Sequence, residues 1–187
     1  MKFKLLLSAL ILLSSHAFSQ SKNNISVVYG FAANDVNIHG AIGDYGYRNK
    51  TGTVYGLTYT RNINKIFSIE TGLLYSVNKI QLSTIGGYGE RFYDQDLKML
   101  SVPVYAKITF LKYLFAQGGV SIDHNLDYSS NSIIQDQSGV GLVLGVGGKY
   151  SFGPVAIFVN PYLVNHAFYA RNNLMEAGVK LGVGYNF

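Results

Sequence analysis

Several histidines of the sequence lie near acidic or hydroxyl residues, which are the side chains from which hydrolytic sites are built. Such a site needs a nucleophile within hydrogen-bond reach of a base that a third group orients. Asp123 and His124 are neighbours in the sequence, so on a strand their side chains point to opposite faces and do not act together. His124 meets Ser130 or Ser132 only if the loop between them folds back. We therefore predict no catalytic residues and expect a protein that is not an enzyme.

A metal or nucleotide site is the other chemistry to consider. His124, Asp127 and His166 are of ligand type, but their spacing matches no known metal motif. We predict no metal site and interpret both histidines as rim residues in water. The glycine-rich run of residues 141–148 lies within a predicted strand and opens no helix, unlike a nucleotide-binding loop. We therefore predict no cofactor.

The segments that carry these residues sort their side chains by size and polarity at alternate positions. In residues 67–78, one set of alternate positions is bulky and mostly apolar, whereas the other set is mostly small or polar. Residues 176–187 repeat the pattern. Since successive side chains of a strand point to opposite sides of a sheet, each segment predicts a strand with one bulky face and one small, polar face.

The spacing of such segments predicts an all-β fold. We expect eight strands, at residues 25–32, 53–62, 66–78, 98–110, 113–125, 139–151, 154–165 and 174–187. Long polar segments at residues 33–52, 79–97 and 126–138, and a shorter one at 166–173, alternate with tight turns at residues 63–65, 111–112 and 152–153. This layout is typical of an antiparallel up-and-down transmembrane β-barrel, with both chain ends on the periplasmic, short-turn side. Pro103 and Pro161 fall inside strands, where we expect bulges or shorter strands.

The volume of such a barrel decides which face is outside. The interior of an eight-stranded barrel is just wide enough for side chains to fill, so the bulky apolar residues must face lipid. Six charged residues of the small face then form a lumen charge network: Glu70, Lys107, Asp123, Lys149, Glu176 and Lys180. A lipid-facing lysine at mid-bilayer costs about 2–4 kcal/mol, which disfavours the opposite register. We interpret the network as a polar plug; an ion path or a buried switch is the alternative.

Aromatic residues at the alternate positions expected to face outward cluster at the short-turn ends of the strands. We predict that they form an aromatic girdle at the membrane interface: Tyr59, Phe67, Phe110, Tyr150, Phe152, Tyr185 and Phe187. The final Phe187 also matches the terminal aromatic strand typical of proteins folded by the outer-membrane insertion machinery. Outer-membrane lipid and, during assembly, this machinery are therefore expected partners.

The start of the chain predicts export. Residues 1–20 combine Lys2 and Lys4 with an apolar run at residues 5–13, too short to span a bilayer, and are interpreted as a signal peptide cleaved after Ser19 or Gln20. We expect the remaining residues 21–187 to form one outer-membrane β-barrel domain, located in the cell outer membrane. The chain has no cysteine, and its net charge of +5 is modest and scattered, so we expect no nucleic-acid partner.

Four segments resemble a known family. They are TVYGLTYTR at residues 53–61, FSIETGLLYS at 67–76, LSVPVYAKITF at 100–110 and LGVGYNF at 181–187. They look like the small outer-membrane β-barrel domain family of Bacteroidetes-type bacteria, often called PorT-like. Glu70 with Gly72, and Pro103 with Lys107, fall where such proteins carry a strand acid and a proline-containing strand. The resemblance implies the barrel fold and allows roles that range from uncharacterised barrels to a factor implicated in protein secretion or maturation.

We therefore expect an integral outer-membrane barrel, non-enzymatic, with a filled lumen and external loops for structural, assembly, secretion or binding roles. The long polar segments carry tyrosines and arginines, which are enriched at binding surfaces and suit a protein or glycan partner: Tyr45, Tyr47, Arg48, Tyr88, Arg91, Tyr93, Tyr128, Tyr169 and Arg171. The alternatives are a narrow pore for ions or small solutes, an outer-membrane lipid-modifying enzyme that uses His124 or His166, and a soluble secreted barrel.

Overall fold

The computed structural model describes residues 22–38, 45–86, 89–128, 136–170 and 172–187. The predicted signal peptide, with Ser19 and Gln20, lies outside these residues. Among the described residues, no helix has the length and apolar character needed to cross a membrane.

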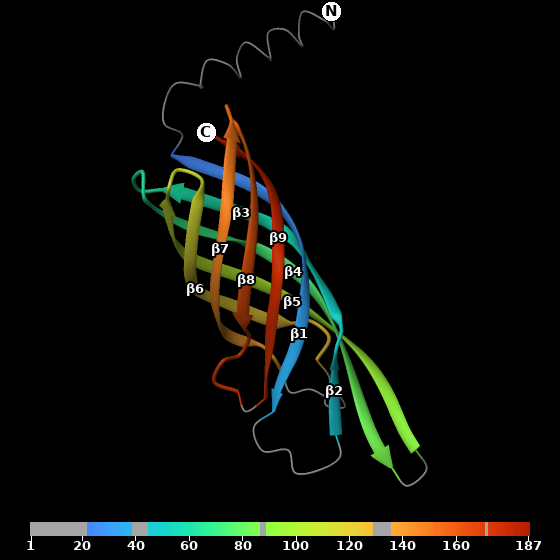
Figure 1. Ribbon diagram of the computed structural model, residues 1–187. Coiled ribbons are helices and arrows are strands. Elements are labelled where there is room, and N and C mark those ends of the chain that lie inside the picture. The colour runs from blue at the N-terminus through green and yellow to red at the C-terminus, as the bar shows by residue number, and fades with distance from the viewer. Residues whose placement is uncertain (1–21, 39–44, 87–88, 129–135, 171) are drawn as a thin grey trace, which may run out of the picture.

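The described chain forms nine strand segments in one antiparallel sheet. They are β1 (Asn23–Ile38), β2 (Tyr45–Asn49), β3 (Thr51–Asn62), β4 (Phe67–Gly86), β5 (Gly89–Phe110), β6 (Leu114–Asn125), β7 (Gly139–Phe152), β8 (Val155–Asn165) and β9 (Asn172–Asn186). From β3 to β9 each strand pairs with the next along the chain, and β2 pairs with β4. β1 pairs with both β3 and β9, which closes the sheet into a barrel (Figure 1).

The barrel wall contains eight strands because β2 continues β3 along the same neighbour. β2 pairs Asn49 with Ile80, and β3 pairs Thr53 with Val77. Between these two pairs the β2–β3 side advances by four residues, whereas β4 advances by three. This difference places a one-residue bulge near Lys50. The predicted eight-stranded antiparallel up-and-down barrel is confirmed.

Two of the predicted long loops are largely strand, which corrects the expected boundaries. β4 and β5 stay paired as far as Gly86 and Gly89, through most of residues 79–97, and project beyond the barrel (Figure 1). The end of β1 and all of β2 occupy parts of residues 33–52. Outside the membrane, water reaches both faces of a strand, so the hydrophobic alternation stops although backbone pairing continues. The polar residues of these segments therefore indicate exposure to water and not the absence of a strand.

The two prolines that lie within strands do not introduce bulges, so that expectation is wrong. Beside Pro103, the β4–β5 ladder pairs Thr71 with Val104 and Leu74 with Ser101, three residues apart on both strands. The β7–β8 ladder also keeps its register beside the proline of β8. An N–H group of an antiparallel strand faces only one of its two neighbours, so each proline interrupts one ladder and leaves the other continuous.

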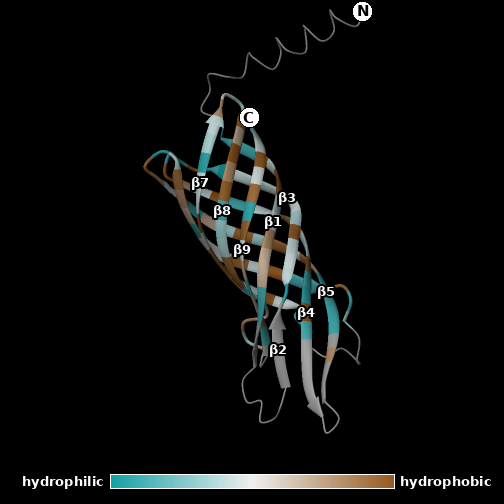
Figure 2. Ribbon diagram, turned by 45° about the vertical axis from the view of Figure 1, so that its right-hand side comes forward, coloured by the Kyte–Doolittle hydropathy of each residue, from teal (hydrophilic) through white to brown (hydrophobic). Residues whose placement is uncertain are grey.

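The outward orientation of the bulky face is confirmed. Along β1, Val27 is 63% exposed and Val28 only 2% exposed, and Figure 2 shows the same alternation of hydrophobic and hydrophilic residues along the barrel strands. The interior also contains an apolar belt that the sequence did not suggest: Val28, Ala32, Val54, Leu74, Tyr105, Val143, Tyr162 and Val164, with Phe158 packed against it.

Glycine on the inner face makes room for the large rings of this belt. A Cβ added at Gly182 would lie 2.2 Å from the ring of Phe158, and one at Gly147 would lie 2.5 Å from the ring of Phe115. Each ring therefore lies over a backbone that carries no side chain. This packing lets aromatic residues fill a narrow barrel without widening it.

Candidate functional site in the barrel interior

The first group of interior charges is an ion pair between strands β4 and β5. Lys107 donates to the carboxylate of Glu70, and the hydroxyl of Thr60 on β3 donates to the same carboxylate at 2.8 Å. The Lys107 Nζ also lies 4.6 Å from the centroid of the Phe115 ring. Both charges are buried, and a buried ion pair of this kind is stable only when both partners are present.

The second group is centred on His166, in the turn that follows β8. Its Nδ1 lies 2.7 Å from Asp123 Oδ2 and its Nε2 lies 3.4 Å from Glu176 Oε2. Ser121 donates to Asp123 at 3.1 Å, and the Tyr162 hydroxyl donates to Glu176. The interpretation of His166 as a rim residue in water is therefore wrong, since only 3% of it is exposed. β8 presents its even-numbered residues inward, and His166 continues that parity one step past the strand.

The remaining two residues of the lumen charge network form no ion pair with the described acids. Lys180 is buried, with its Nζ 3.9 Å from the centroid of the Tyr162 ring. Lys149 is only partly buried and lines a cavity at the short-turn mouth of the barrel. All six residues thus lie on the inner face, as an ion pair, a histidine-bridged pair of acids and two further lysines.

The interior between these groups is nearly full. Its cavity has a volume of about 20 Å³ and is lined by residues that include His166, Glu176 and Lys180. A space of this size holds about one water molecule. Its walls are residues of the apolar belt, three serines, and His166 and Glu176 with Lys180. The cavity therefore leaves no room for a substrate beside His166.

The structure does not bring the candidate metal ligands together. His124 is exposed on the outer face, Asp127 pairs with Lys98 at 2.8 Å, and His166 lies inside the barrel. Among the described residues, no group of three or more such side chains could hold a metal ion. The candidate nucleophiles Ser130 and Ser132 lie outside the described residues.

The seven residues of the aromatic girdle all lie at the short-turn end. Five are 43–58% exposed: Phe67, Phe110, Tyr150, Phe152 and Phe187. Tyr59 and Tyr185 are partly buried, and Tyr59 donates to Asn23 at 2.7 Å. Tyr113, which the sequence analysis did not include, stacks on Tyr150 with 5.7 Å between ring centroids. Its position next to the tight turn of residues 111–112 could have indicated this place.

Comparison with known proteins gives this geometry its context. The sequence model of the outer membrane protein beta-barrel domain matches residues 5–187. This chain belongs to the outer membrane protein beta-barrel domain family. It is an integral barrel protein of the cell outer membrane, and the short turns of such barrels face the periplasm. No curated protein sequence matches the chain significantly.

Two solved structures are similar to this chain at low sequence identity. The outer membrane protein OprG from Pseudomonas aeruginosa is 16% identical, with a TM-score of 0.58 over 90% of this chain and 98% of OprG. Ail, the attachment invasion locus protein of Yersinia pestis, is 18% identical, with a TM-score of 0.45 over 89% of this chain and 99% of Ail.

The filled interior of this outer membrane beta-barrel domain predicts that it conducts no ions. We expect the purified chain, inserted into a planar bilayer, to give no discrete single-channel steps, because the lumen leaves room for about one water molecule. A large porin in the same bilayer is the positive control, and the heat-modifiable gel band of the inserted chain confirms its fold. Stable, voltage-independent steps from the folded chain would contradict the prediction.

Proposed function

We propose that this protein is a non-enzymatic binding or assembly component of the outer membrane that acts through strands reaching beyond the barrel. The strand extension consists of β2, residues 80–86 of β4 and residues 89–95 of β5. The observation that carries the proposal is this extension, three paired strands on the extracellular side of a barrel whose interior is closed.

The strand extension has polar side-chain contacts between its strands. Asp94 accepts hydrogen bonds from Lys50 at 2.8 Å and from Gln81 at 2.7 Å. These bonds join the β2–β3 junction to both strands of the hairpin and hold the pKa of Asp94 below its ordinary value. A preorganised surface loses less conformational entropy when it binds a partner.

The edge of β2 that forms no ladder pairs among the described residues suits a protein partner. Among the described residues, β2 pairs only with β4, so its second edge offers backbone N–H and C=O groups to another strand. Tyr45, Tyr47 and Arg48 lie on this strand, and Arg91 and Tyr93 lie on β5. Tyr128 and Tyr169 are 50% and 65% exposed elsewhere, whereas Tyr88 and Arg171 lie outside the described residues.

The sequence resemblance supports an assembly role. Four segments resemble the PorT-like barrels of Bacteroidetes-type bacteria, which include a factor implicated in protein secretion or maturation. The interior geometry supports the absence of catalysis, because Ser121 donates to Asp123 and His166 is enclosed between two carboxylates.

The proposal is tested by shortening the hairpin in the native host. Residues 81–94 are replaced by Asn-Gly, which joins paired strands at Ile80 and Gln95. Affinity-tagged full-length and shortened chains are then purified in mild detergent after brief cross-linking. We expect one or more outer-membrane proteins to co-purify with the full-length chain and to be lost with the shortened chain.

Folding of the shortened chain is checked by its heat-modifiable band. A chain with Phe168→Ala, which changes an exposed aromatic residue outside the strand extension, is the matched control. The proposal would be contradicted if the same proteins co-purified with the full-length and the shortened chain, or if no protein co-purified with the full-length chain. Glycan binding by the full-length chain without any protein partner would assign the surface to a different class of ligand and would also contradict it.

A further inference from the structure

We propose that the periplasmic end of the barrel binds an anionic phospholipid, with its phosphate at a ring of lysines and an acyl chain in a groove of the outer wall. The site is separate from the strand extension, which lies at the opposite end of the barrel (Figure 1).

The charged side chains of the periplasmic end are all basic. Lys22, Arg61, Lys65 and Lys112 lie at the starts and turns of the short-turn end, and Lys149 lies just inside the mouth. The sequence places no aspartate or glutamate in residues 22–26, 60–69, 106–117, 147–158 or 181–187. The acids of the exposed surface therefore lie toward the other end. This end therefore has a positive potential that would stabilise a bound anion.

Four of these lysines converge on one cavity at the mouth. It has a volume of about 280 Å³ and is lined by Lys22, Asn62, Ile63, Asn64, Lys65, Ser68, Thr109, Lys112 and Lys149. Among the described residues, none of the four lysines forms an ion pair with a carboxylate. Ammonium, amide and hydroxyl groups together donate hydrogen bonds to a phosphate from several directions.

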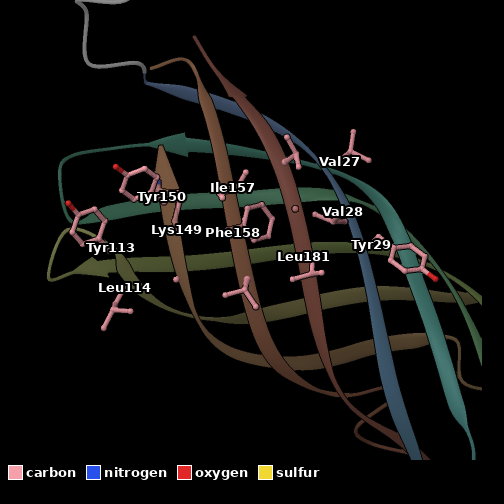
Figure 3. Close-up of a pocket in the computed structure, with 14 residues that line it drawn as sticks. Val27, Val28, Tyr29, Tyr113, Leu114, Lys149, Tyr150, Ile157, Phe158 and Leu181 are labelled. Carbon is pink, nitrogen blue, oxygen red and sulfur yellow. The ribbon is translucent and has the colours of Figure 1, made fainter. Parts of the chain in front are cut away.

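An apolar groove of about 750 Å³ lies on the lipid-facing wall beside this mouth. Figure 3 shows Tyr113 and Tyr150 on one side of the groove and Tyr29 on the other, with Ile157 and Leu181 between them. The groove therefore crosses β8 and β9, with tyrosine rings at both of its sides. Such a shape accepts an extended hydrocarbon chain along its length.

Gly148 explains why the wall is hollow here. It pairs with Leu114 and Val159, both exposed on the outer face, so its own side-chain position also points to lipid. A Cβ at Gly148 would meet nothing closer than 3.9 Å. The missing side chain leaves space next to Tyr150 that a larger residue would fill.

The groove and the basic mouth adjoin each other. Lys149 lines both. The Lys112 Nζ, at the mouth, lies 5.5 Å from the centroid of the Tyr113 ring, which lines the groove. Tyrosine of an aromatic girdle marks the headgroup level of a membrane. A lipid with its chain in the groove thus places its phosphate beside the lysines.

The charge of the mouth favours a headgroup with a net negative charge. A zwitterionic headgroup brings its own ammonium group to the lysines, whereas phosphatidylglycerol or cardiolipin brings only phosphate. Basic pockets at membrane interfaces recognise anionic headgroups in this way. The inferred ligand is therefore an anionic phospholipid of the periplasmic leaflet.

The absence of tryptophan from the chain allows a site-specific test. Full-length protein with Val159→Trp in the groove is reconstituted in phosphatidylcholine vesicles that contain a fraction of brominated phosphatidylglycerol or of brominated phosphatidylcholine. Bromine quenches tryptophan on contact, so the ratio of quenching measures lipid selectivity at the groove. We expect a preference for phosphatidylglycerol on the order of tenfold at low salt, and a smaller one at high salt.

Three variants separate the site from bulk lipid. Lys22→Gln, Lys65→Gln and Lys112→Gln together change exposed residues and should abolish the preference, whereas Lys79→Gln at the extracellular end should preserve it. Gly148→Leu should exclude the chain while all lysines remain. Val104 lies on the opposite wall and is 45% exposed. A tryptophan introduced there by Val104→Trp should report no lipid preference.

Equal quenching by both lipids in the groove would overturn the inference. So would the same preference at Val104→Trp, which would show only general enrichment of the anionic lipid, or a groove preference that survives the triple lysine variant or Gly148→Leu. None of these outcomes depends on the partner of the strand extension.

Discussion

Replacing Glu70 by glutamine is expected to lower the free energy of unfolding by about 3–5 kcal/mol, because it leaves the buried ammonium of Lys107 without a counter-charge. Glu70 and Lys107 are 5% and 6% exposed, so water cannot solvate the remaining charge. Thr60 also loses a charged acceptor. The change is measured by urea unfolding of the full-length chain in phospholipid vesicles, followed by the mobility of the folded band on a gel.

The double variant Glu70→Gln with Lys107→Met shows that the loss arises from the unpaired charge. It removes both charges, and replacing a buried pair by uncharged side chains is often close to neutral. We therefore expect most of the stability to return. Thr60→Val is the matched control, expected to cost about 0.5–1.5 kcal/mol. Single variants of Glu70 and Lys107 that each cost less than the control, or additive losses in the double variant, would contradict this account.

Leu144→Lys is expected to destabilise the barrel by about 2–4 kcal/mol. Leu144 lies near the middle of β7, is 64% exposed in the structure and points to lipid. An ammonium there must leave water for the hydrocarbon core, or reach the interface along its own side chain at a cost in packing. The same unfolding assay in vesicles measures the effect.

Depth in the membrane is the variable that the control changes. Leu126 follows β6 at the extracellular end and is 46% exposed. Leu126→Lys introduces the same side chain near the interface, where the expected cost is about 0–1 kcal/mol. Equal costs at both positions would mean that the wall around Leu144 is not in contact with hydrocarbon.

The sequence predicted the wall of the barrel better than its ends. In β7, exposed Leu142 and Leu144 alternate with buried Gly141 and Val143, because lipid on one side and a narrow lumen on the other impose different side chains. Beyond the barrel, the paired segments of β4 and β5 are mostly polar in sequence. Their pairing up to Gly86 and Gly89 depends on backbone hydrogen bonds between segments that leave no hydrophobic period in the sequence.

Parity alone placed Glu70, Asp123 and Glu176 on the inner face, but it could not name their partners. Asp123 and Glu176 lie on β6 and β9, which are separated in the barrel by β7 and β8. They meet through His166 only because the lumen is narrow enough for side chains to cross it. Such contacts run across the barrel axis, whereas strand periodicity describes only one wall.

The sequence by itself determined that this chain is an antiparallel membrane barrel with its bulky residues outside. Alternate side chains of each strand differ because one set faces lipid and the other faces the lumen. The tertiary structure alone decided which interior charges pair, how far the strands continue into water, and that the basic mouth adjoins an apolar groove. These features depend on distances between strands that closure of the barrel sets, and side-chain order along one strand does not record them.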